Sequence, residues 1–150
     1  MTDVRTTLSG RVALVTGAGR RVGRAIALAL GARGMRVAVH YNGSAEGAQE
    51  TARLIHDAGG VATLAQADLT RVVECERLID RTVEEGGELF ALVNSAAIMV
   101  RTPVGEATSG EWDAMFALNV RAPFFLAQRA APALRAARGV IVNIADLAAY

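Results

Sequence analysis

LVTGAGRRVGRAI, at positions 14–26, is the stretch from which the fold can be predicted. The apolar segment over 12–15 predicts a short strand, and Val22, Ile26 and Leu30, spaced four residues apart, predict a helix after it. Glycines between the two leave bare main chain at the helix N-terminus. Backbone N–H groups there lack internal partners, and the helix dipole favours an anion. This strand, turn and helix together predict a phosphate-binding site.

The spacing of the glycines excludes two common phosphate loops. Gly17 and Gly19 are followed by Gly23, one residue later than the pattern G-x-G-x-x-G requires. A Walker-type loop needs a lysine before serine or threonine, and the chain contains no lysine. The turn is therefore of another kind.

Three arginines, at positions 20, 21 and 24, stand in or just after the turn. Positive charge is unfavourable at a helix N-terminus, by about 0.3–1 kcal/mol for each residue. A bound polyanion would remove this conflict. The alternative interpretation is a solvated basic turn without a ligand.

The composition is typical of one globular domain. The chain has 150 residues, of which 52% are hydrophobic, and a net charge of +1. A charge so close to zero predicts no broad surface for nucleic acid or anionic lipid, and no apolar run is long enough to span a membrane. The N-terminus lacks the pattern of a signal peptide, and the single Cys75 excludes a disulfide framework and a cysteine-based metal cluster. We therefore expect a cytoplasmic protein with no metal, nucleic-acid or membrane partner.

Apolar strand segments alternate with amphipathic segments along the whole chain. Strands are predicted over 12–15, 36–41, 61–65, 90–93 and 140–144, with helices between them, the last a long one over about 110–137. This alternation predicts an α/β fold of the doubly wound Rossmann type, a parallel sheet with helices on both faces. Ligands of such sheets bind beyond the carboxyl ends of the strands. The small and polar residues at these ends, which we expect to line one crevice, are Thr16, Gly17, Tyr41, Asn42, Asp68, Leu69, Asn94, Ser95 and Asp146.

Single residues mark some of the helix ends and one irregularity. Ser44 and Thr70 are predicted to cap the helices that follow them. Within the long helix, Pro123 has no N–H to donate to the carbonyl of Asn119, four residues earlier. That carbonyl needs another partner, water or ligand, unless the proline merely kinks the helix.

Five motifs, in this order along the chain, resemble those of the short-chain dehydrogenase/reductase family. They are Thr16-Gly17 to Gly23, with Arg21 in place of the usual middle glycine; Asp68-Leu69; Asn94-Ser95-Ala96-Ala97; Asn119-Val120-Arg121-Ala122-Pro123; and Ile141 to Asp146, with Asp146 in place of the catalytic serine. The resemblance extends over essentially the whole chain and implies a dinucleotide-binding domain over residues 1–150. It implies that Asn119 and Asp146 are catalytic. The residues it leads us to expect in the cofactor site are Gly17, Gly19, Arg20, Arg21, Val22, Gly23, His40, Tyr41, Asn42, Ser44, Asp68, Leu69, Asn94, Ser95, Ala96 and Val120.

Two departures from the family pattern resemble the pteridine reductases and dihydropteridine reductases. These are the arginine before Val22-Gly23 and the aspartate in place of serine, and His40-Tyr41 followed by Ser44 is also similar to those enzymes. Two other features differ from them. No aromatic residue stands near Ile98-Met99, where those enzymes stack the pterin, and Gly43 replaces a basic residue.

The end of the second strand predicts NADP(H) rather than NAD(H) as the cofactor. An NAD site needs a carboxylate there to accept a hydrogen bond from the ribose 2′-hydroxyl. The first acid after this strand is Glu46, which is already in the next helix. Arg20 can instead bind a 2′-phosphate, with Ser44 and His40 as further donors.

The family's catalytic Tyr-x-x-x-Lys motif is missing, because Tyr150 lies only four residues after Asp146 and there is no lysine. The last predicted strand would also leave an apolar sheet edge open. We therefore expect the cofactor-binding part of a longer reductase, a fold incomplete at its C-terminal end. A non-catalytic dinucleotide-binding module is the alternative, whereas a flavodoxin-like or methyltransferase domain would leave Asn119, Pro123 and Asp146 unexplained. The helix over 110–137 resembles the one that pairs subunits in this family, which implies a homo-oligomer.

The aspartate at position 146 indicates which class of substrate the site would accept. A serine hydroxyl can donate a hydrogen bond to a carbonyl oxygen, whereas an ionised aspartate can only accept one and would repel a developing alkoxide. We therefore expect NADPH-dependent hydride transfer to the C=N of a small substrate such as a pteridine, with a 3-oxoacyl-type or other carbonyl substrate as the alternative. A protonated Asp146 would donate as serine does, and one that only caps the following turn would not touch substrate.

Overall fold

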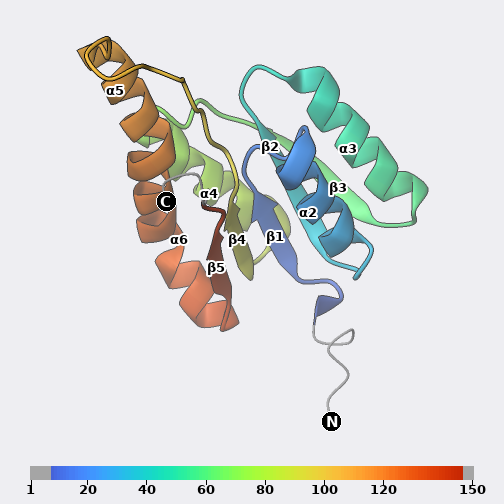
Figure 1. Ribbon diagram of the computed structural model, residues 1–150. Coiled ribbons are helices and arrows are strands. Elements are labelled where there is room, and N and C mark those ends of the chain that lie inside the picture. Colours follow the sequence, from blue (N-terminus) through green and yellow to red (C-terminus); the bar gives the residue numbers. More distant parts are fainter. Residues whose placement is uncertain (1–7, 147–150) are drawn as a thin grey trace.

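Five short strands form one parallel sheet in the computed structural model, which describes residues 8–146 (Figure 1). The elements in chain order are β1 (Val12–Val15), α2 (Arg21–Gly31), β2 (Arg36–Tyr41), α3 (Ala45–Asp57), β3 (Val61–Gln66), α4 (Val72–Gly86), β4 (Ala91–Asn94), α5 (Ser109–Phe116), the π-type turn η1 (Ala117–Arg121), α6 (Ala122–Ala137) and β5 (Val140–Asn143). The strands lie in the order β3-β2-β1-β4-β5, and all neighbours are parallel. The predicted doubly wound α/β fold is confirmed.

Helices cover both faces of the sheet, α2 and α3 on one side and α4 and α6 on the other (Figure 1). Side chains of the central strand β1 alternate between the two apolar layers, with Val15 in the first and Leu14 in the second, both fully buried. The helices bury one stripe each, as Ala48, Ala52 and Ile55 of α3 do. The central strands are therefore closely packed on both faces, and this packing supports the loops at the carboxyl ends of the sheet.

The predicted helix caps are only partly correct. Ser44 is at the N-cap position of α3, but its side chain makes no capping hydrogen bond. Thr70 does not cap α4, whose N-cap is the next residue, because its hydroxyl donates to the carboxylate of Asp68. A complete capping box at the start of α5 was not predicted: the side chains of Thr108 and Glu111 each accept a hydrogen bond from the other's backbone N–H.

The long helix predicted over 110–137 is interrupted by the wide turn η1. In this turn the N–H of Ala122 donates to the carbonyl of Ala117, five residues earlier. Pro123 follows in the first turn of α6, where a missing N–H is tolerated. The helix therefore accommodates the proline by widening at Asn119 and continues beyond it.

β5 is the last strand at one edge of the sheet. Its apolar side chains Val140, Ile141 and Val142 are 46%, 39% and 41% exposed. Among the described residues nothing covers them to the extent that β1 is covered. The apolar edge predicted from the sequence is thus present.

Candidate functional site

A cleft of about 720 Å³ opens at the carboxyl ends of the strands, within the range of small-molecule sites. Its walls come from the segments that follow all five strands and from η1. The predicted site residues that line it are Gly17, Gly19, Arg20, Arg21, Val22, Gly23, His40, Tyr41, Asn42, Ser44, Asp68, Leu69, Ser95, Ala96 and Asp146. Six further lining residues were not assigned to the site from the sequence, although Ala97, Ile144 and Ala145 lie within the motifs quoted above: Gly43, Thr70, Ala97, Leu118, Ile144 and Ala145. Each of them adjoins a predicted residue or another of the six, so adjacency in sequence was the available signal.

The glycine-rich turn brings bare main chain to this cleft. Gly17 has a φ of 64°, in the left-handed region, and a Cβ on it would lie 2.8 Å from Cα of Ala96. A Cβ on Gly23 would overlap the carbonyl of Gly17. Glycine is therefore required at both positions, and the space it leaves allows a phosphate group to approach the N-terminus of α2.

The three arginines of the turn have different environments. Arg21 has a φ of 50°, a left-handed conformation that costs a non-glycine residue about 1–2 kcal/mol. Arg20 and Arg21 are exposed, and within residues 8–146 neither guanidinium has a hydrogen bond or an ion pair. Arg24 is turned away from the cleft and donates to the carbonyls of Gly19 and Gly47. Two of the three charges are thus available to an anion, and the third is not.

Thr16 fastens the turn to the loop after β4. Its side chain is buried, and its hydroxyl oxygen accepts hydrogen bonds from the N–H groups of Ser95 and Ala96, both at 3.0 Å. The hydroxyl donates to the carbonyl of Val93 at 3.3 Å. Thr16 therefore holds two walls of the cleft together and does not face a ligand.

His40 fastens the same turn to the end of β3. The residue is 2% exposed; Nδ1 accepts the N–H of Gly17 at 3.1 Å, and Nε2 donates to the carbonyl of Ala67 at 3.0 Å. These partners require the neutral imidazole with its proton on Nε2. Burial lowers the pKa of His40 from 6.5 to about 4, against the opposing effect of the hydrogen bond to Ala67. No N–H is left for a phosphate group, so the predicted role of His40 as a donor to the cofactor is wrong.

Asp68 presents a carboxylate at the β3 side of the cleft. Thr70 donates to its Oδ1 from the hydroxyl at 2.7 Å and from the backbone N–H at 3.0 Å. The hydroxyl hydrogen bond, the backbone hydrogen bond and the charge of Arg71 lower the pKa of Asp68. The following residue, Leu69, is buried, and its carbonyl accepts the S–H of Cys75 at 3.3 Å. The segment is therefore fixed, and Oδ2 is the oxygen through which Asp68 can bind a ligand.

Asn94 lies beneath the cleft rather than in its wall. It is 5% exposed, and its Nδ2 donates to Oδ1 of Asn143 on the neighbouring strand at 2.8 Å. Its backbone carbonyl accepts the N–H of Ile144 at 2.9 Å. Asn94 thus joins β4 to β5 and supports Ser95, which does line the cleft.

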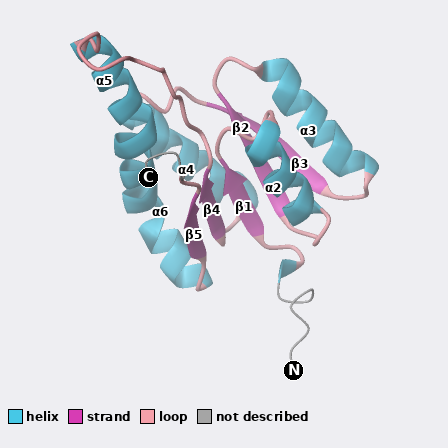
Figure 2. Cartoon of the chain, viewed as in Figure 1, coloured by secondary structure: helices cyan, strands magenta, loops and turns pink. Residues whose placement is uncertain are grey.

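Asn119 also binds the protein itself. Its Oδ1 accepts the N–H of Ile98 at 3.0 Å, and its Nδ2 donates to the carbonyl of Ile98 at 2.7 Å. These two bonds hold the loop between β4 and α5, the long pink segment beside α5 in Figure 2, against η1. Val120 is 54% exposed and lies outside the cleft. The catalytic role of Asn119 stays a prediction, and its contacts fix the cleft-side loop.

The order of the strands separates the two acids of the cleft. Asp68 follows β3 at one edge of the sheet, and Asp146, which is exposed, follows β5 at the other. The glycine-rich turn follows the central strand β1 and therefore lies between them. Such a cleft suits an elongated ligand with its negative charge in the middle. Residues 8–146 contain no group of three or more side chains that could hold a metal ion, and no helix in that range could cross a bilayer.

Comparisons with known proteins agree with this geometry. A family model described as short chain dehydrogenase matches residues 11–150. Hydroxynaphthalene reductase-like protein Arp2 of Metarhizium guizhouense is 42% identical over 142 residues, 95% of this chain and 53% of its own length. The chain thus spans about half the length of this curated relative.

Two crystal structures with bound NADP are similar in fold and sequence. A metagenomic short-chain oxidoreductase in complex with NADP has a TM-score of 0.89 and 38% identity, over 95% of this chain and 65% of that one. The landomycin C-6 ketoreductase LanV, with bound NADP and rabelomycin, has a TM-score of 0.87 and 39% identity, over 93% of this chain and 59% of that one. The names of these three proteins refer to hydroxynaphthalene or ketone reduction or to oxidoreductases in general, and none refers to a pteridine.

Proposed function

The chain belongs to the short-chain dehydrogenase family, and on that premise we propose that it binds NADP(H) in the cleft and takes part in hydride transfer to a small substrate. The main support for the proposal is the bare main chain at Gly17 and Gly23 beside Arg20 and Arg21, whose guanidinium groups have no hydrogen bond or ion pair within residues 8–146. When bound, the nicotinamide of the cofactor supplies the hydride. The residues of the chain bind and orient the two reactants.

The separation of the acids gives the cofactor a direction in the cleft. The pyrophosphate would lie on the N–H groups at the start of α2. Adenine carries an amino group, and Oδ2 of Asp68 can accept a hydrogen bond from it. The nicotinamide end would then lie toward Ser95 and Asp146, which line the opposite part of the cleft.

The charges at the mouth of the cleft favour NADP(H) over NAD(H). Arg20 is exposed with no partner within residues 8–146, and Ser44 lines the same cleft with a side chain that makes no capping hydrogen bond. A guanidinium and a hydroxyl are suitable donors for a 2′-phosphate. Calorimetric titration of the full-length protein should give a Kd for NADPH at least about tenfold below that for NADH, a difference of about 1.4 kcal/mol. Equal or tighter binding of NADH would contradict the assignment.

Asp146 supports a substrate that contains a C=N group. As a carboxylate it accepts hydrogen bonds and cannot donate one, so it suits a protonated ring nitrogen better than a carbonyl oxygen that becomes an alkoxide. It would hold a proton at the nitrogen beside the acceptor carbon, which makes that carbon a better hydride acceptor. A reduced pteridine is the substrate class with this chemistry.

A carbonyl substrate is the second candidate, and the names of the relatives favour it. Arp2 is named for hydroxynaphthalene reduction and LanV for ketone reduction. The full-length protein and its Asp146→Ser variant should be compared on dihydropteridines and on small ketones. We expect the parent to prefer the pteridine and the variant to lose that preference. A parent that prefers ketones, or a variant with full pteridine activity, would refute the role of Asp146; no turnover of either class would favour a non-catalytic dinucleotide-binding module.

An outer stripe of apolar side chains favours a homo-oligomer. Trp112, Phe116, Val120 and Phe124 recur every four residues along α5, η1 and α6, and all four are exposed. The rings of Trp112 and Phe116 are stacked, with centroids 4.4 Å apart. Light scattering after gel filtration should give more than one copy for the wild-type protein and fewer for a Phe124→Ser variant. A monomeric wild type would contradict this assembly.

A further inference from the structure

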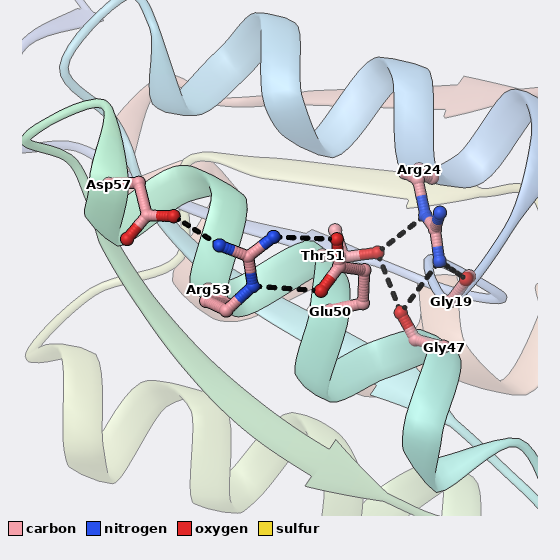
Figure 3. A network of polar contacts seen from close by, with 7 residues as sticks. All are labelled: Gly19, Arg24, Gly47, Glu50, Thr51, Arg53 and Asp57. Carbon is pink, nitrogen blue, oxygen red and sulfur yellow. Dashed lines mark hydrogen bonds and ion pairs between the residues drawn. The ribbon is translucent and has the colours of Figure 1, made fainter.

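Arg24 belongs to α2, and its side chain lies in the gap between the glycine-rich turn and α3 and binds groups on both sides of that gap (Figure 3). Its Nη2 is 2.7 Å from the carbonyl oxygen of Gly19, in the glycine-rich turn, and 3.1 Å from that of Gly47, in the first turn of α3. Its Nε donates to the hydroxyl of Thr51 at 3.1 Å. The guanidinium therefore connects the glycine-rich turn before α2 to the first two turns of α3.

Thr51 completes the contact from within the protein. The residue is fully buried, and its hydroxyl oxygen is 2.9 Å from the carbonyl of Ala18 and 2.9 Å from that of Gly47. A hydroxyl has one proton to donate, which these two carbonyls share, while its oxygen accepts from Arg24. Thr51 thus binds the same turn and the same helix as Arg24 does.

The two backbones approach so closely that Gly47 admits no side chain without a shift and Gly19 leaves little room for one. A Cβ on Gly47 would lie 2.6 Å from the carbonyl oxygen of Gly19, and a Cβ on Gly19 would lie 3.2 Å from the N of Ala48. The carbonyls of Gly19 and Gly47 direct their negative ends at one guanidinium. Without that charge the carbonyl of Gly19 would lose this donor with no replacement from Thr51, whose hydroxyl donates to Ala18 and Gly47, and the gap would widen.

We propose that Arg24 and Thr51 are positioning residues that set the preference for a cofactor with a 2′-phosphate. Arg20 directly follows Gly19, and Ser44 precedes Gly47 by three residues. The gap that Arg24 spans therefore fixes the distance between the two groups assigned to the 2′-phosphate, although neither Arg24 nor Thr51 lines the cleft. The inference rests on the proposed function, because it concerns the same cofactor.

A widened gap would affect the two cofactors differently. The 2′-phosphate of NADPH needs Arg20 and Ser44 at one spacing, whereas NADH lacks this group and depends on the turn and the rest of the cleft. The expected signature of the positioning residues is a change in the ratio of the two dissociation constants. A merely structural role would weaken both cofactors equally or neither.

The test is calorimetric titration of full-length variants with NADPH and with NADH. Arg24→Met, which keeps the length of the side chain and removes its charge and donors, should raise the Kd for NADPH about tenfold and that for NADH less than about twofold. Thr51→Val should change the ratio of the two dissociation constants in the same direction. Thr51→Ser, which keeps the hydroxyl, should have the wild-type ratio. Arg53→Met is the matched control for loss of an arginine, because Arg53 is on α3 with Thr51 and pairs only with Glu50 and Asp57 among the contacts drawn in Figure 3.

The outcomes separate the two proposals. A wild-type protein without a preference for NADPH would overturn both. A wild-type preference that survives in a folded Arg24→Met variant, or that falls equally in Arg53→Met, would overturn the positioning role alone, as would equal weakening of both cofactors. If Arg24→Met does not fold, Arg24→Lys takes its place, since an ammonium keeps the charge but cannot match the three-acceptor geometry of the guanidinium, and it should show the same shift in ratio.

Discussion

Acidification should destabilise this protein at pH values where most carboxylates are still ionised, because of His40. In the folded protein the imidazole is neutral, buried and engaged at both nitrogens, by Gly17 and Ala67. A proton on Nδ1 would remove the acceptor for the Gly17 N–H and bury a charge. Unfolding exposes the ring to water and lets it take up the proton.

The sign and size of the effect follow from the two pKa values. The pKa of His40 is about 4 in the folded protein, below its ordinary value of 6.5, so the unfolded chain binds more protons between these limits. The stability from the neutral ring is fully present above pH 6.5 and is lost as the pH falls toward 4. The loss between pH 7 and pH 5 is about 2 kcal/mol, and the total is about 3 kcal/mol. For a domain of this size, 2 kcal/mol corresponds to a fall in Tm of about 4–8 °C.

The assay is denaturant unfolding at pH 7 and at pH 5, for the wild type and a His40→Gln variant. The amide of glutamine has a donor and an acceptor but does not titrate, so the variant should be less stable at pH 7 and should lose about 2 kcal/mol less on acidification. Carboxylates titrate in both proteins and cancel in the comparison. If the two proteins lose the same free energy to within about 0.5 kcal/mol, His40 is not the acid-sensitive group and the reasoning fails.

Three further substitutions have defined outcomes. Arg21→Gly should raise the free energy of unfolding by about 0.5–1 kcal/mol, because relief of the left-handed strain exceeds the entropy of glycine, while calorimetry should show weaker NADPH binding. Gly23→Ala should cost about 1–3 kcal/mol and at least tenfold in NADPH affinity, because the new Cβ displaces the carbonyl of Gly17; unchanged binding would refute the phosphate cradle. Arg11→Met should lower stability by about 1–2 kcal/mol through loss of its ion pair with Glu88 and its ring contact, with the Kd for NADPH unchanged because Arg11 is at the amino end of the sheet.

The strands and the phosphate turn could be predicted because both depend on local pattern. A run of apolar residues such as 12–15 has few alternatives to a buried strand, and two glycines at a strand end permit a backbone that other residues do not. The cleft followed from topology alone, since the ends of parallel strands must meet at one side of the sheet. Even the six lining residues that were not assigned to the site lie within two positions of an assigned one.

The partners of the polar residues could not be predicted. His40, Arg24 and Asn119 all carry polar groups at the expected site, yet each binds backbone contributed by a segment more than twenty residues away. Whether such a side chain faces a ligand or its own fold depends on its rotamer and on how closely other loops approach. Neither the rotamer nor the approach of other loops can be deduced from the spacing of residues in the sequence. Pro123 likewise signalled a disturbance at Asn119 but not that the helix would widen.

The wide turn η1 brings the exposed apolar side chains of α5 and α6 into line. From Trp112 to Phe124 a regular helix rotates about 120° beyond three full turns, which would spread the outer stripe around its surface. Because η1 holds one extra residue, the actual rotation from Trp112 to Phe124 is smaller than in a regular helix by about 100°. The four side chains therefore lie nearly on one line.

Deletion of a single residue from η1 would close it to an α-helical turn and leave this alignment unchanged, because the extra residue is the one removed. Closure of η1 with all its residues retained would instead rotate α5 by about 100° relative to α6. The sheet and the glycine-rich turn would be untouched, but Trp112 and Phe116 would no longer share a face with Phe124. Along this segment the wide hydrogen-bond pattern of η1, rather than the identity of any one apolar residue, decides whether the molecule presents a continuous apolar surface. A change in the hydrogen bonds of this one turn would therefore act at a distance, on any assembly that uses this face.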